Sequence, residues 1–199
     1  MTRFLAIVLS CTALPVLAQE LPVLADVTGV AANDVLNIRA VPNAGGAIIG
    51  TLAPDATGVE VMAIEGDWAL VNSNEGAGYA AMRFLDPDES TVWYDLELQP
   101  LACSGTEPFW GLDIDPVAGT TVFWVADPSE TQAGTMGDRW IGQPWAQSAA
   151  FSLPDRLVVL QPQACSDGMS DRAFGIGIDI FLTDSQGARY SGCCSLIPR

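Results

Sequence analysis

The sequence predicts an all-β protein built of two small modules. In residues 24–86, short apolar runs that alternate with polar residues recur every ~8 to 12 residues between Gly- or Pro-containing turns, and no helical spacing is present. The second half is also rich in alternating apolar runs. All cysteines beyond residue 18 lie after residue 100. We therefore expect a first β module without disulfides and a second one that is stapled by them.

Residues 1–18 are predicted to be a signal peptide. A short positive start at 1–3 precedes an apolar stretch at 4–17, and cleavage is expected after Ala18. We expect a periplasmic or secreted mature protein with no transmembrane segment. Lipid anchoring at Cys11 is the alternative, because residues 8–11 resemble a lipobox.

The composition excludes several reaction classes. Among 199 residues there are 24 acidic and 8 basic side chains, every basic one is Arg, and histidine is absent. Ser–His and Cys–His nucleophile pairs, Schiff-base lysines and His-ligated zinc or haem are thereby excluded. A net charge of -16 argues against nucleic acid as a partner, because phosphate contacts need Arg and Lys clusters. We expect no cofactor and no metal.

The first module, residues 24–86, carries an ordered set of short motifs. They are Leu-Asn-Ile-Arg at 36–39, Ile-Gly-x-Leu at 49–52, Val-x-Val at 59–61, Gly-Asp-Trp-Ala-x-Val at 66–71 and Gly-Tyr at 78–79. In this order and spacing they resemble the bacterial SH3-like domain. The resemblance implies a small SH3-like barrel that binds rather than catalyses, with peptidoglycan or a periplasmic protein as its partner.

Four side chains of this module are candidate binding residues. Trp68 and Tyr79 offer aromatic surface with a polar group, although Trp68 could instead fill the barrel core and Tyr79 could cap it. Asn37 and Arg39 alternate with the apolar Leu36 and Ile38, so they are expected to face solvent, as binding residues or as a solvated edge.

An acidic stretch interrupted by proline, residues 87–97, is predicted to link the modules. The second module, 98–199, is expected to be a β barrel or sandwich. Its clearest element is the apolar alternation from Phe174 to Leu182, which a turn at 184–187 joins to a returning strand at 188–194.

Three motifs of the second module together resemble an exported bacterial domain family of unknown function. They are Cys-x-Gly-Thr-Glu-Pro-Phe-Trp at 103–110, Cys-x-Asp-Gly-Met-Ser-Asp at 165–171 and Gly-Cys-Cys at 192–194. This resemblance implies no activity. A shorter one, Gly-Ala-Arg-Tyr at 187–190, is similar to the inhibitory loop of periplasmic lysozyme inhibitors.

The cysteines are expected to form structural disulfides. Cys193 and Cys194 occupy successive strand positions, so their side chains point to opposite faces and a bond between them is disfavoured. One of them should therefore pair with Cys103 and the other with Cys165. Which one takes which partner stays open.

A pair of carboxylates is the hydrolytic scheme that the composition still allows, and Glu107, Asp167 and Asp171 are its weak candidates. Ordinary turn chemistry explains the same residues. The sequence therefore predicts a binding module without catalysis. The alternatives are a carboxylate-dependent glycan hydrolase in the second module and a lysozyme-inhibitor-like protein.

Overall fold

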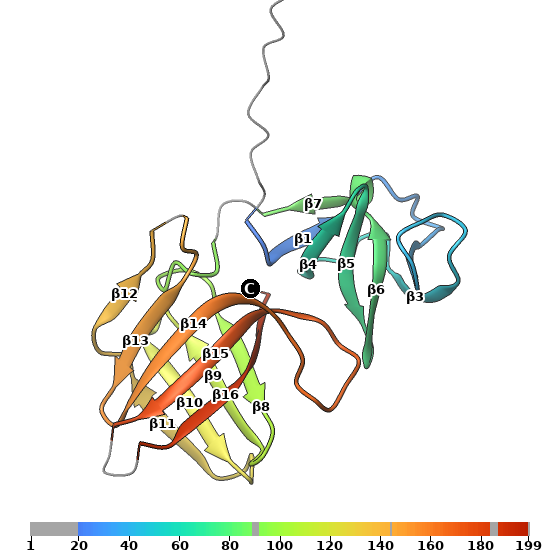
Figure 1. Ribbon diagram of the computed structural model, residues 1–199. Helices are drawn as coiled ribbons and strands as arrows, with labels where there is room; N and C mark the ends of the chain where they lie inside the picture. Colours follow the sequence, from blue (N-terminus) through green and yellow to red (C-terminus); the bar gives the residue numbers. More distant parts are fainter. Residues whose placement is uncertain (1–19, 89–91, 144, 184–186, 199) are drawn as a thin grey trace, which may run out of the picture.

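The computed structural model describes residues 20–88, 92–143, 145–183 and 187–198. The predicted signal peptide and the alternative of a lipid anchor at Cys11 lie outside these residues. The described chain is all-β: it forms two antiparallel sheets, contains no α-helix, and has a 3-10 turn, η1 (Met82–Phe84), near the end of the first sheet. Figure 1 shows the two sheets as separate bodies that lie side by side.

The first sheet has seven strands in the order β3-β2-β6-β5-β4-β1-β7. Consecutive strands pair as hairpins from β4 to β6, and β2 joins β6 through the Arg39–Tyr79 pair. The strands are β1 (Val23–Val27), β2 (Leu36–Arg39), β3 (Ile48–Leu52), β4 (Val59–Glu65), β5 (Trp68–Ser73), β6 (Gly76–Ala81) and β7 (Leu85–Pro87).

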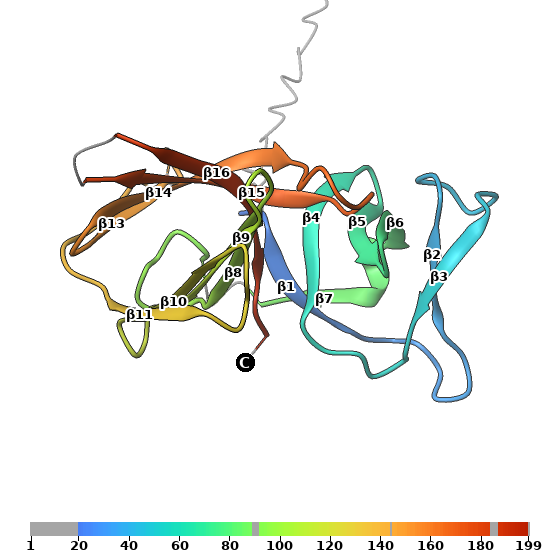
Figure 2. The same cartoon turned by 90° about the horizontal axis from the view of Figure 1, so that it is seen from below.

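The second sheet has nine strands in the order β11-β10-β9-β8-β16-β15-β14-β13-β12 and curls into a half-barrel. Figure 2 looks along this curl. The strands are β8 (Leu101–Gly105), β9 (Trp110–Asp115), β10 (Thr120–Val125), β11 (Thr131–Thr135), β12 (Arg139–Ile141), β13 (Ala149–Leu153), β14 (Arg156–Cys165), β15 (Phe174–Leu182) and β16 (Arg189–Leu196).

Each sheet buries one face of its alternating strands in its own core. In the first sheet, Ile38, Val61 and Val71 are buried together. In the second, the predicted alternation in β15 buries Ile176, Ile178 and Ile180. On the other face, Gly175 and Gly177 allow neighbouring residues to approach the strand closely. A Cβ at Gly175 would lie 3.0 Å from Pro22, and one at Gly177 would lie 2.5 Å from Gln163.

The segment expected to link the modules contributes to the second core. Trp93, Tyr94 and Leu96 are buried among the side chains of the second sheet. The Trp93 indole N–H also donates to the carbonyl of Leu21, just before β1, over 3.1 Å. Residues 93–96 are thus packed structure, which the acidic and Pro-containing sequence did not indicate.

An arm between β14 and β15 reaches from the second sheet onto the first (Figure 1). The Asn72 side chain both donates to and accepts from the backbone of Ala173, each over 2.9 Å. Close by, the Asp171 N–H donates to the Glu75 carbonyl over 2.8 Å, and Asp171 forms an isolated parallel β-bridge with Gly76. The two sheets are therefore held together by specific polar contacts.

Two disulfides staple the second module, as predicted. Cys103 of β8 pairs with Cys194, its register partner on β16. Cys165, at the base of the arm, pairs with Cys193. The vicinal cysteines occupy successive positions of β16, so each finds a different partner. The connectivity that the sequence left open is decided by the register of β16 with β8, which sets Cys194 opposite Cys103 and Cys193 opposite Ser104.

Candidate functional site

The first module contains a groove that gathers three of its four candidate residues. The groove has a volume of about 440 Å³ and lies between β2, the start of β5 and η1. Asn37 and Arg39 line it from β2, and Trp68 lines it from β5. Arg83 and Phe84 of η1 complete this part of the wall.

Both basic residues of the described first module, Arg39 and Arg83, line this groove. Arg39 donates through Nη1 to the carbonyl of Gly46 over 2.7 Å, which fixes its guanidinium beside the hairpin loop. Arg83 is exposed, and its guanidinium lies 4.5 Å from the centre of the Phe84 ring. Within the described residues neither Arg forms an ion pair.

Trp68 and Tyr79 have different surroundings. Trp68 is partly buried and also lines the groove, so it contributes both to packing and to the candidate site. Tyr79 is not among the lining residues; its hydroxyl donates to Glu65 Oε1 over 2.7 Å, and this hydrogen bond raises the pKa of Tyr79. Three of the four predicted residues therefore line one groove. The fourth, Tyr79 on β6, is the register partner of Arg39 on β2.

The three candidate catalytic carboxylates do not line this groove or the two other cavities described below. Asp167 accepts hydrogen bonds from the backbone N–H groups of Met169 (3.0 Å) and Ser170 (2.9 Å) and from the Ser170 hydroxyl (2.9 Å). Burial raises the pKa of Asp167, but these hydrogen bonds and Arg172 outweigh it, so the pKa is lowered. Glu107 and Asp171 are exposed. The hydrogen bonds of Asp167 are those of an Asp that stabilises its own turn.

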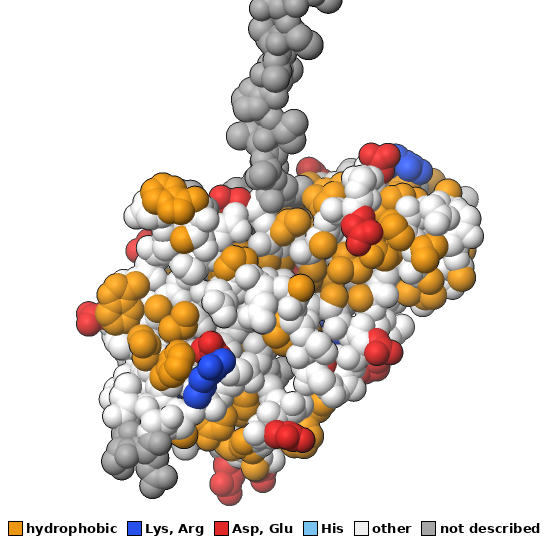
Figure 3. Space-filling view, viewed as in Figure 1, with side chains coloured by type: hydrophobic (Ala, Val, Ile, Leu, Met, Phe, Trp, Pro, Cys, Tyr) orange, Lys and Arg blue, Asp and Glu red, His pale blue; other side chains and the backbone are white. Residues whose placement is uncertain are grey.

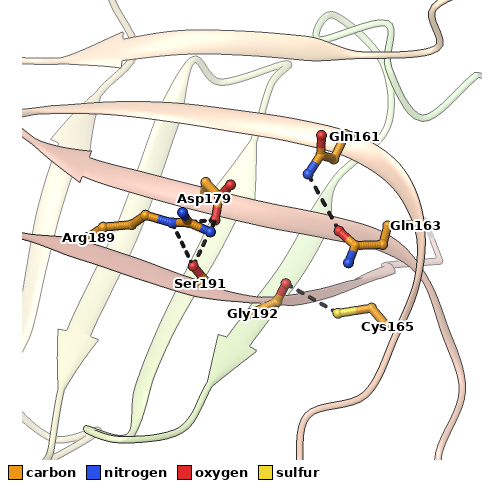
Figure 4. A network of polar contacts seen from close by, with 7 residues as sticks. All are labelled: Gln161, Gln163, Cys165, Asp179, Arg189, Ser191 and Gly192. Atoms are coloured by element: carbon orange, nitrogen blue, oxygen red, sulfur yellow. Dashed lines mark hydrogen bonds and ion pairs between the residues drawn. The ribbon is translucent and has the colours of Figure 1, made fainter.

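The tetrapeptide that is similar to a lysozyme-inhibitor loop has internal partners. Arg189 of β16 donates to Asp179 Oδ1 and to Ser191 Oγ, each over 2.9 Å, as Figure 4 shows. The Tyr190 ring is partly buried and packs against Trp110 and Phe123. Both side chains are therefore accounted for by contacts within the second sheet.

The largest of the three cavities lies between the sheets. It has a volume of about 590 Å³, and its lining combines Met62 and Leu70 of the first module with Pro162 and Cys165 of β14 and Phe174 of β15. Its walls are mostly apolar. Nothing in the sequence pattern indicated this cavity, because its two sides come from strands about a hundred positions apart.

The contribution of η1 to the groove was not predicted from the sequence. Arg83 was available as a signal, because it is the other cation of the first module, but only the fold brings it into one groove with Arg39. On the face in Figure 3, acidic side chains lie scattered and few cationic ones are visible. A pair of arginines in one groove is therefore unusual on this protein.

Among the described residues, no three Cys, Asp or Glu side chains gather closely enough to hold a metal ion. No helix in the described chain is both long and apolar enough to cross a membrane. Comparison of the chain with protein-family models, with curated proteins and with solved structures gives no match.

Proposed function

We propose that this is an exported binding protein without catalysis of its own, and that the groove of its first module binds a carboxylate-bearing ligand, either a cell-wall fragment or a periplasmic protein. The observation that carries the proposal is the pairing of Arg39 and Arg83 in one groove with Trp68. The two disulfides of the second module fit an oxidising compartment outside the cytoplasm.

The chemistry of the groove suits a ligand with a carboxylate next to an apolar or ring-shaped part. A guanidinium without an ion-pair partner offers hydrogen bonds to carboxylate oxygens in a fixed fork. Arg83 stacks on Phe84, which orders its long side chain before binding. Trp68 supplies a flat apolar surface, and Asn37 adds a neutral amide to the same wall.

Salt dependence follows from this arrangement. Arg83 is exposed, so its attraction for a carboxylate is screened as ionic strength rises. The chain is strongly acidic and Asp34 lines the groove itself, so the two cations have to overcome repulsion of an anionic ligand both locally and at longer range. We expect weak binding that is lost at high salt.

Glycan hydrolysis by the second module is the alternative from a different class. It needs two carboxyl groups that converge on one bond in an open cleft. Asp167 instead uses its oxygens to hold its own turn. The structure thus supplies no observation that favours hydrolysis over binding.

A pull-down of the mature protein on insoluble peptidoglycan tests the wall version. We expect Arg83→Gln and Trp68→Ala each to reduce the bound fraction several-fold at low salt. Arg189→Gln, which changes an arginine on the second sheet, is the matched control and should bind like the unchanged protein.

The protein-partner version is tested by a photo-crosslinking residue at Val35, an exposed position on the groove wall. A crosslink to a periplasmic protein that Arg83→Gln abolishes would support it. If neither peptidoglycan binding nor a crosslink depends on Arg83, the proposal for this groove is wrong.

A further inference from the structure

The second module has a cavity of its own, apart from the groove of the first. It has a volume of about 500 Å³ and lies between the β10–β11 hairpin and the turn that joins β13 to β14. We call it the Arg156 cavity; its lining includes Thr121, Phe123, Gln132, Leu153 and Arg156. This volume is in the range of sites for small molecules, and the mouths of β-barrels are common places for them.

Arg156 is held rigidly at this cavity. It is only 7% exposed, although arginine is rarely buried. Its Nε and Nη2 donate to the two oxygens of Asp155 over 2.9 and 2.7 Å, and its guanidinium lies 4.3 Å from the centre of the Phe123 ring. A two-point ion pair on one side and an aromatic face on the other leave the group little freedom.

The cavity is short of hydrogen-bond acceptors. Nη1 of Arg156 is buried without an acceptor among the described residues. Thr121, a buried residue, lines the same cavity, and at this cavity Nη1 is the buried side-chain atom without a partner among the described residues. Buried donors without acceptors are rare in folded proteins because they lose their hydrogen bonds to water.

Besides the Asp155 carboxylate, the Arg156 guanidinium has one uncharged acceptor among the described residues, the side-chain amide of Gln132. Its side-chain Oε1 accepts from Arg156 Nη2 over 3.2 Å, the longest of the three hydrogen bonds described for this guanidinium. Gln132 is exposed and lies on β11, the edge strand of the sheet. It is therefore the partner most easily displaced, and the oxygen it presents belongs to an uncharged amide.

The charges at the cavity favour an uncharged ligand. Asp155 already neutralises Arg156 through two hydrogen bonds, so the cavity offers a ligand anion no unpaired cation. The chain as a whole carries a net charge of -16, which further disfavours an anion.

We propose that the Arg156 cavity binds an uncharged amide-bearing small molecule, whose carbonyl oxygen replaces that of Gln132 beside Arg156 and Thr121 and whose apolar part packs on Phe123 and Leu153. An acetamido sugar and a peptide amide share this chemistry. The site is independent of the first-module groove, so each can fail without the other.

Backbone amide chemical shifts of the full mature protein test the proposal, with N-acetylglucosamine and N-acetylalanine methylamide as separate probes. Glucose is the matched control, because it lacks the amide. For ligands of this size an affinity of about 1 mM is expected. We expect at least one amide probe to cause saturable shifts at residues 121–123, 132–135 and 153–156, and the probe that does so identifies the source of the amide.

Three variants separate binding from structure. Arg156→Met should weaken binding about tenfold or more, because it removes a charged donor. Arg189→Met, which removes the other Asp-paired arginine, should leave binding unchanged. Gln132→Ala should strengthen binding several-fold, since the internal competitor is gone, and a purely structural role of Gln132 predicts no such gain.

Gln132→Ala decides the proposal even where Arg156→Met fails to fold. The proposal is overturned if neither amide probe gives saturable shifts at the cavity up to about 20 mM. It is also overturned if glucose binds as well as N-acetylglucosamine when that sugar is the active probe, or if Gln132→Ala leaves the affinity unchanged or weaker.

Discussion

Glu60 of β4 connects the two modules through a partly buried carboxylate. Its Oε1 accepts a hydrogen bond of 3.0 Å from the backbone N–H of Leu196 on β16. Burial raises the pKa of Glu60 from 4.5 to about 7, although the Leu196 N–H, Ser195 and Arg172 act to lower it. The Ser195 hydroxyl and the Arg172 Nε are themselves buried without a well-formed hydrogen bond, so neither fully compensates the carboxylate.

We predict that Glu60→Gln removes a pH-dependent loss of stability. A group whose pKa is higher in the folded than in the unfolded chain stabilises the folded state below its unfolded pKa, and this contribution disappears as the pH rises through the folded pKa. For Glu60 the contribution is full below about pH 4.5 and is lost by about pH 8. The difference of the two pKa values corresponds to about 3 kcal/mol. Glutamine keeps an oxygen for the Leu196 N–H and carries no charge.

Urea unfolding between pH 4 and pH 8.5 measures this effect. The stability of Glu60→Gln relative to the unchanged protein should rise with pH, by up to about 3 kcal/mol, with its midpoint below pH 7. Glu130→Gln, at an exposed loop residue of the second module, is the control and should show no such rise. A difference between Glu60→Gln and the unchanged protein that stays flat across this pH range would refute the reasoning.

Three further predictions concern what holds each module. Reduction of both disulfides should unfold the second module, because their cysteines are 91 and 28 residues apart and each bond contributes about 3 to 5 kcal/mol to its stability. The first module, which has no cysteine, should keep its folded amide spectrum. Free thiols under non-reducing peptide mapping would contradict this prediction. Trp93→Ala should cost about 3 to 5 kcal/mol in thermal or urea unfolding, because this side chain is 1% exposed, and a loss below about 1 kcal/mol would show that it is not part of the core. Asn72→Ala removes both hydrogen bonds to Ala173 and should speed limited proteolysis between Leu85 and Trp93, whereas unchanged cleavage would mean that the arm does not hold the modules together.

The strand pattern was open to prediction because it is local. Alternation from Phe174 to Leu182 places every second side chain on one face of a strand, and the observed β15 has the same bounds. That Cys193 and Cys194 bond to Cys103 and Cys165 and not to each other followed from the same geometry, but which takes which did not. The SH3-like resemblance of the first module stays a prediction, since the all-β fold alone does not identify a family.

The candidate groove could be predicted only in part. Asn37 and Arg39 follow from alternation with buried neighbours, and Trp68 from its chemistry. Whether Trp68 would lie in the core or at a surface depends on what covers it. In the structure Trp68 is partly buried and also lines the groove, whose wall η1 completes. Arg83 joins the site because η1 directly follows β6, which pairs with β2, and no spacing in the sequence encodes that pairing.

The sequence by itself determined the all-β class, the two modules, the separate partners of the vicinal cysteines without their assignment, and the exclusion of histidine and lysine chemistry. The tertiary structure alone decided the contacts between residues far apart in the sequence. These are the burial of Trp93 in the second core, the hydrogen bonds of the Asn72 side chain with Ala173, and the hydrogen bond from the Leu196 N–H to Glu60. The physical reason is that side-chain alternation acts between neighbours, whereas burial of a carboxylate or pairing of an amide depends on which surfaces of the two sheets meet. Those surfaces exist only after both cores have formed.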